Sequence, residues 1–195
     1  MLHIANLEEI QGALLRLPQL VDLLERRDPR SIGEVKNWLT TLEQILVNNR
    51  LPLAGNVAGL RGILSASERG VIPPGVVFHG KPTLRRIREA TAVDVLRRAG
   101  DLVANAVQED SSRIAEAERL GHQIVAVAQS NGLLPAQSSG GDRYKVLKDL
   151  WGSLSADPNV KAGAVRLQGL IGHNDALVIL DRAITANAVT NPSAL

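Results

Sequence analysis

The spacing of aliphatic side chains constrains the fold of this chain more than any other feature. Leu, Ile, Val and Ala recur at three- and four-residue steps through most of the 195 residues. The chain holds only one Phe, one Tyr and two Trp, so the aromatic residues that favour strands are almost absent. This pattern predicts an all-α protein: an antiparallel helical bundle around a long central helix, with a smaller C-terminal helical hairpin.

The composition excludes several classes of site. Because the chain has no Cys, it has no disulfide, no thiolate nucleophile and no Cys-ligated metal or cluster. The 45% hydrophobic and 22% charged fractions are typical of a globular protein. No stretch approaches the roughly 18 apolar residues of a membrane span, so we expect a cytoplasmic protein that does not bind membranes. The excess of Arg over Lys suggests a bacterial origin.

Local signals mark expected helix boundaries. Two capping-box patterns, a cap residue followed three positions later by Glu, predict helix starts: Asn6 with Glu9, and Ser31 with Glu34. Pro18 lacks the N–H that a helix interior needs and clashes with the preceding turn. We therefore expect a kink or break just before it, near residues 16–17.

The longest apolar pattern runs from about residue 83 to residue 131 at heptad-like intervals and predicts the central helix, or two helices in line. An interruption is expected at residues 109–112 (Glu-Asp-Ser-Ser), because Asp and Ser prefer caps to helix interiors. A weaker helix is expected over residues 53–69. Its Gly55 and Gly59 predict an unusually close approach of two helices.

These signals suggest a division of the chain into parts. We expect a helical bundle over residues 1–131 and a linker or ordered loop over residues 132–143, which are rich in Gly and Ser. Residues 144–187 are expected to form the C-terminal helical hairpin, packed on the bundle. The tail, residues 188–195, has little to bury and should fray.

One glycine-containing segment comes close to a phosphate-binding loop. Gly75 and Gly80-Lys81 have the spacing of that motif, but Pro82 stands where the metal-binding hydroxyl belongs. No buried strand is expected before the segment. The favoured interpretation is an interhelix loop whose Thr83 caps the next helix.

Residues 81–98 carry the strongest charge asymmetry. Their six basic residues are offset only by Glu89 and Asp94, which leaves a local charge of +4. One interpretation is a solvated face that pairs with acids on neighbouring helices, and the other is a nucleic-acid surface, although aromatic side chains that stack on bases are nearly absent. The candidate nucleic-acid-binding residues are Lys81, Arg85, Arg86, Arg88, Arg97 and Arg98.

Arg166 and His173, with six residues between them, resemble the Arg-x4-6-His motif of the HEPN family of helical ribonucleases. That resemblance implies a metal-independent ribonuclease in which the two side chains meet at a dimer cleft. The residue after the Arg is normally polar in that family, whereas this chain has Leu167. The alternative is a surface Arg and a capping His.

No other constellation points to catalysis. The four histidines, His3, His79, His122 and His173, show no metal-binding spacing, and the sequence predicts no metal site and no cofactor. No Gly-x-Ser-x-Gly elbow is found. An enzyme is therefore not the favoured interpretation.

The leading functional hypothesis is a non-catalytic helical interaction module, either an adaptor or a scaffold that self-associates into a homo-oligomer. It would bind a protein partner through an exposed aliphatic stripe of the central helix, which extends further than one compact neighbour could cover. Nucleic-acid binding through residues 81–98 is the first alternative and the HEPN-like ribonuclease the second. The stripe consists of Leu102, Val103, Ala106, Ile114, Ala117, Leu120 and Ile124.

Overall fold

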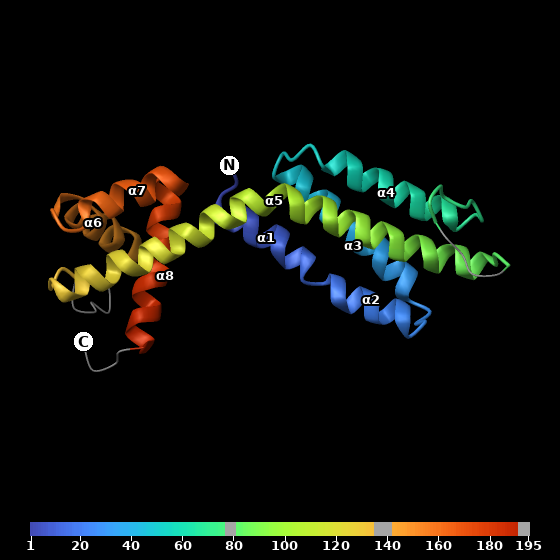
Figure 1. The fold of residues 1–195 in the computed structure, drawn as a ribbon, viewed down its shortest axis with the longest axis horizontal. Coiled ribbons are helices and arrows are strands. Elements are labelled where there is room, and N and C mark those ends of the chain that lie inside the picture. The colour runs from blue at the N-terminus through green and yellow to red at the C-terminus, as the bar shows by residue number, and fades with distance from the viewer. Residues whose placement is uncertain (77–80, 135–141, 191–195) are drawn as a thin grey trace. The chain divides into compact units, whose positions relative to one another are not determined.

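The computed structural model describes residues 1–76, 81–134 and 142–190 (Figure 1). Within these ranges the protein is helical and contains no strand, which confirms the predicted all-α class. The helices are α1 (Ile4–Leu14), α2 (Leu17–Glu25), α3 (Ser31–Asn48), α4 (Ala54–Ser67), α5 (Leu84–Ser130), α6 (Arg143–Ala156), α7 (Lys161–Ile171) and α8 (His173–Thr190).

Contacts between residues divide the chain into two compact units. The first unit comprises residues 4–108 with Leu2, and the second comprises residues 109–195 with Met1 and His3. The long central helix α5 contributes residues to both units, and the boundary at residues 108 and 109 falls inside it. Each unit therefore uses a different part of the same helix.

Helix α5 is unbroken, so the expected interruption at residues 109–112 is wrong. Each Asp or Ser in a helix interior costs at most about 0.7 kcal/mol relative to Ala, and propagation of an existing helix is cooperative. Asp110 is also paired within the helix, with the Arg113 side chain one turn later. The Asp- and Ser-rich cluster thus marks the boundary between the units without ending the helix.

The break before Pro18 is confirmed. Helix α1 ends at Leu14 and α2 begins at Leu17, with the proline in the first turn, where its missing N–H costs nothing. The indole Nε1 of Trp38 on α3 donates a 2.8 Å hydrogen bond to the carbonyl oxygen of Ala13 near the end of α1. The buried tryptophan thereby satisfies a carbonyl group near this break.

Helix α3 is the centre of the first unit. It contacts α4, α1 and α2, and it ends at Asn48. Large side chains that are less than 2% exposed fill the space between these helices. They are Ile4, Ile10, Val35, Trp38, Leu39, Leu42, Leu46 and Leu64.

The helix start predicted at Ser31 is confirmed and the one predicted at Asn6 is wrong, and neither predicted capping box forms. Helix α1 already begins at Ile4, so Asn6 lies inside it. At the start of α3 no side chain caps the helix, and Ser31 is buried. Instead the carboxylate of Asp28 accepts a 2.8 Å hydrogen bond from the backbone N–H of Arg30.

The predicted close approach at Gly55 and Gly59 is also wrong, because a Cβ added at either position would meet nothing within 4 Å. The close approaches occur at other glycines. A Cβ at Gly121 of α5 would collide with Cγ2 of Ile179 on α8, and a Cβ at Gly163 of α7 would lie 3.2 Å from Cγ1 of Ile124.

In the second unit, α6, α7 and α8 contact one another. Asp142 caps α6 by accepting a hydrogen bond from the N–H of Tyr144, and Gly172 ends α7 with a φ of +82°. Of the expected linker at 132–143, residues 135–141 lie outside the described residues. Of the expected frayed tail, residues 188–190 continue α8 and residues 191–195 lie outside the described part of the chain.

Candidate functional site

Three aliphatic side chains are exposed together at one end of the first unit. Gly70 follows α4 with a φ of +86°, and the N–H of Val71 closes the turn on the carbonyl of Ala66. Val71, Ile72 and Leu84 are 52%, 48% and 45% exposed. Leu84, the first residue of α5, lies against Gly70, because a Cβ built there would be 3.7 Å from its Cδ1. The start of α5 and the turn after α4 are therefore in contact.

Polar contacts join this turn to α3 and α5. Lys36 of α3 forms a 3.0 Å ion pair with the Glu68 carboxylate, and Nη2 of Arg88 on α5 donates a 2.7 Å hydrogen bond to the Glu68 carbonyl. Residues 26–30 connect α2 directly to the start of α3. The turn after α4 is therefore held against α3 and the start of α5, and α2 leads directly into α3.

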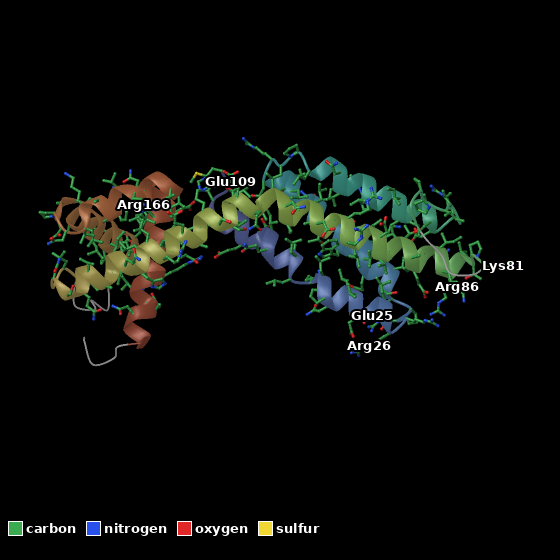
Figure 2. All side chains as sticks on the ribbon, viewed as in Figure 1. Glu25, Arg26, Lys81, Arg86, Glu109 and Arg166 are labelled. Carbon is green, nitrogen blue, oxygen red and sulfur yellow. The ribbon has the colours of Figure 1, made fainter. Side chains whose placement is uncertain are left out.

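Exposed cations lie at the same end of the unit as these aliphatic side chains. Figure 2 shows Arg26 in the α2–α3 connection at this same end. It also shows Lys81, in the segment before α5, and Arg86, in the first turn of α5, at this end. Among the described residues, Arg27, Arg69 and Lys81 form no ion pair. We define the basic end as the exposed cations Arg27, Arg69, Lys81 and Arg86 together with Val71, Ile72 and Leu84.

Only part of the predicted basic segment belongs to this surface. Arg85 pairs with Glu89 on its own helix at 2.7 Å, and Arg97 and Arg98 share Asp94 at 3.4 and 3.3 Å. Arg88 is half-buried and serves the contact with α4. Of the six candidates, Lys81 and Arg86 remain as exposed cations that lie at the basic end.

Four residues of the basic end were not predicted from the sequence: Arg27, Arg69, Val71 and Ile72. A signal for the aliphatic pair was present, because Val71 and Ile72 precede Pro73 in a segment with no helical spacing that would bury them. No signal in the sequence places Arg27 at this end of the unit, because that depends on how α2 and α3 pack.

Thr83 caps α5, as the interpretation of residues 75–83 as an interhelix loop predicts. Its Oγ1 accepts a hydrogen bond from the backbone N–H of Arg86 at 3.4 Å. Gly80 and the three residues before it lie outside the described residues. In the described ranges no strand precedes this helix, and a phosphate-binding loop needs one.

Asp28, an acidic residue at the basic end, is held in its charged form. The Arg30 guanidinium donates to both oxygens of the Asp28 carboxylate, at 3.1 and 2.9 Å, and the Arg30 backbone N–H adds a third hydrogen bond. These contacts, first of all the side-chain hydrogen bonds from Arg30, lower the pKa of Asp28 from 3.8 to about 2. Asp28 therefore neutralises Arg30 and leaves the neighbouring Arg27 uncompensated.

The predicted partner-binding stripe of α5 is largely covered by the chain itself. Val103, Ile114, Ala117 and Ile124 are buried, each less than 9% exposed. Leu102 and Leu120 are half-buried, and Ala106 alone is exposed. Helix α5 is longer than one neighbour could cover, as expected. Residues of both units cover successive parts of it, so most of the stripe is not exposed.

Arg166 and His173 contact different partners. Arg166 of α7 pairs with Glu116 of α5, whereas the His173 ring stands edge-on to Trp151 of α6 with 6.0 Å between ring centroids. The two side chains that resemble the HEPN motif are thus engaged with different helices of the second unit.

Neither the other described residues nor any known relative indicates a function. No group of three or more His, Asp or Glu side chains could hold a metal ion in the described ranges. None of the helices searched there is long and apolar enough to cross a membrane. Comparison of the chain with protein-family models, curated proteins and solved structures finds no match.

Proposed function

We propose that this protein is a non-catalytic helical interaction module that binds another protein through the basic end. The observation that carries the proposal is the exposure of Val71, Ile72 and Leu84 together with cations at one end of the first unit. Protein interfaces commonly combine an apolar centre with a polar rim, and Arg is enriched in them. The proposal includes the cytoplasmic location expected from the sequence.

The charge of the basic end favours a different protein over a second copy of this chain. In a two-fold dimer each surface meets itself, so Arg27, Lys81 and Arg86 would face the same cations of the other copy. Like charges brought together at an interface cost free energy and suppress that pairing. Size-exclusion chromatography with light scattering should therefore give the mass of a single chain.

Site-specific photocrosslinking in cells tests the module. A photoreactive amino acid at Ile72 should give a discrete adduct heavier than the chain. The same amino acid at Val47 is the control, because Val47 is similarly exposed, at 53%, but lies at the far end of α3. The proposal fails if position 72 gives no adduct, or if positions 47 and 72 give the same adducts.

Nucleic-acid binding remains the second candidate, because Lys81 and Arg86 are exposed and could reach phosphates. It predicts binding to a labelled duplex or single strand that weakens steeply with salt. Absence of any mobility shift at low salt would exclude this candidate.

A further inference from the structure

Helix α5 is followed by the only Asn-Gly pair in the sequence, Asn131 and Gly132. Asn131 is exposed, and Gly132 has a φ of +66°. The N–H of Gly132 donates to the carbonyl of Gln129 at 3.0 Å, and the N–H of Leu133 donates to the carbonyl of Ala128 at 2.9 Å. These two hydrogen bonds form a Schellman cap, in which Gly is preferred at the left-handed position. The cap therefore places a glycine directly after an exposed asparagine.

An exposed Asn before Gly reacts with its own backbone. The nitrogen of Gly132 bonds to Cγ of Asn131, the bond from Cγ to Nδ2 breaks, and Nδ2 leaves as ammonia with the proton of the Gly132 N–H. Water then opens the resulting succinimide ring at either of its carbonyl carbons, which leaves Asp or isoaspartate. Gly favours the attack because no Cβ hinders the approach of its nitrogen, and a Cβ built at Gly132 would meet nothing within 4 Å.

We propose that Asn131 is a site of spontaneous covalent modification, where deamidation alters the cap of α5 and its contact with α8. The inference does not depend on the basic end. The reaction requires the Gly132 N–H to separate from the Gln129 carbonyl. Helix ends fray and open at a lower free energy than helix interiors, so this separation is accessible without unfolding of the unit.

Both products weaken the end of α5. The new carboxylate lies at the C-terminus of the helix, where a negative charge opposes the macrodipole. Isoaspartate also adds a carbon atom to the backbone at residue 131, so the two hydrogen bonds of the cap lose their spacing. Gln129 belongs to the same turn, and its Oε1 accepts a hydrogen bond from Nδ2 of Asn187 on α8. Loss of this turn therefore loosens a contact between two helices of the second unit.

Asn159 supplies an internal control. It is exposed and lies in a turn, as Asn131 does. The N–H that follows it, of Val160, donates to the carbonyl of Asp157 at 3.2 Å, so it is hydrogen-bonded like that of Gly132. The two sites differ in the residue that supplies the nitrogen. The branched side chain of Val160 hinders the attack that Gly132 permits.

The test follows deamidation of the full chain. The protein is incubated at about pH 8 in water enriched in heavy oxygen, then digested and analysed by mass spectrometry. Opening of the succinimide by water introduces heavy oxygen, so the label records only reactions that occur during the incubation. We expect label at residue 131 to accumulate at least about tenfold faster than at residue 159, because a branched Cβ hinders the second site.

N131Q tests the chemistry of the site. The longer side chain would have to close a larger ring, so we expect residue 131 of this variant to remain unlabelled. Its amide keeps the same hydrogen-bonding groups, and its thermal unfolding should match that of the unmodified wild type. A general loss of structure during incubation is therefore distinguished from the reaction at Asn131.

Hydrogen exchange tests the structural consequence. After incubation, the wild type should exchange faster at the end of α5 and in the C-terminal half of α8, whereas N131Q kept for the same time should not change. Q129A should reproduce the faster exchange in α8 without any modification, because it removes the hydrogen bond to Asn187.

Three results would each overturn the inference. They are absence of label at residue 131, equal labelling of residues 131 and 159, and labelling of residue 131 that leaves exchange at the end of α5 unchanged.

Discussion

Both units of this protein bury large aliphatic side chains, but they differ in what an added methyl group would meet at their helix glycines. In the first unit, α3 is surrounded by large residues such as Trp38, Leu39 and Leu42, which are fully buried. In the second unit, helices meet at glycines, with Gly121 against Ile179 and Gly163 against Ile124. The first unit should therefore be most sensitive to the loss of volume, and the second to its gain.

The largest effect is expected from L42A. Leu42 is completely buried among the helices of the first unit, and its truncation leaves a cavity there. We expect the free energy of unfolding of this unit to fall by about 2–5 kcal/mol. Hydrogen exchange followed by mass spectrometry should show faster exchange in peptides of α1 to α4. A loss below about 1 kcal/mol would mean that the first unit is not closely packed.

The next effect is expected from G121A in the second unit. An added methyl group collides with Cγ2 of Ile179, whose branched side chain has little freedom to move. Overpacking of this kind costs typically about 1–3 kcal/mol, against about 1 kcal/mol gained from the better helix propensity of Ala. Denaturant unfolding should show a net loss.

G100A is the matched substitution in the first unit. There the added methyl group would lie 2.9 Å from Cδ1 of Leu17, the far end of a flexible side chain. Leu17 can change rotamer, so G100A should be neutral or stabilising. Equal losses in G100A and G121A would remove the difference between the units. A double variant G121A/I179A should lose less than the sum of its single variants, because the collision is absent.

These glycines show where sequence reasoning reaches its limit. Spacing alone predicted close contacts at Gly55 and Gly59, but the contacts occur at Gly121 and Gly163. A glycine pattern shows that a close approach is allowed. Which glycine faces a neighbour depends on the rotation of each helix, and that is set by packing between segments far apart in the chain.

Elements specified by local chemistry were predictable. Pro18 breaks the first helical region because its ring and missing N–H act within one turn, and the spacing of apolar residues gave the extent of α3 and α5. The boundary between the units was recognised only as a cluster of cap-forming residues at 109–112. Whether such a cluster ends a helix depends on the tertiary contacts of the helix on either side.

The candidate surface was predictable only in part, for the same reason. Lys81 and Arg86 were identified from local charge, whereas Arg85, Arg97 and Arg98 were identified equally and prove to be paired along α5. Arg27 lies at the same end of the unit because the α2–α3 connection, with the neighbouring Arg26, lies there (Figure 2). Charge counts cannot show which cations are already neutralised.

A smaller effect, of opposite sign, is expected from R27G in the first unit. Relief of the left-handed backbone should raise its free energy of unfolding by about 1 kcal/mol. R50G should give a similar gain at the other end of α3. Thermal unfolding measures both, and a lower midpoint in R27G would show that the Arg27 side chain stabilises the fold.

The smallest effect concerns Asp28, which pairs with Arg30 at the basic end. Because hydrogen bonds from Arg30 lower its pKa to about 2, below the 3.8 of the unperturbed group, the folded state favours the charged carboxylate. The stabilisation that follows is complete above about pH 4 and is lost as the pH falls toward 2. The stability difference between the wild type and D28N should therefore shrink over this interval.

An NMR titration of the Asp28 carboxyl carbon gives the sharper measurement. Its midpoint should lie near 2 in the wild type and return toward 3.8 in R30A, which removes the first cause of the shift. D142N is the control, and it should leave the Asp28 midpoint unchanged. Asp142 accepts a hydrogen bond from the backbone N–H of Tyr144 in the second unit and has no part in the pair between Asp28 and Arg30. An unchanged Asp28 midpoint in R30A would show that the backbone N–H, and not the guanidinium, holds the charge.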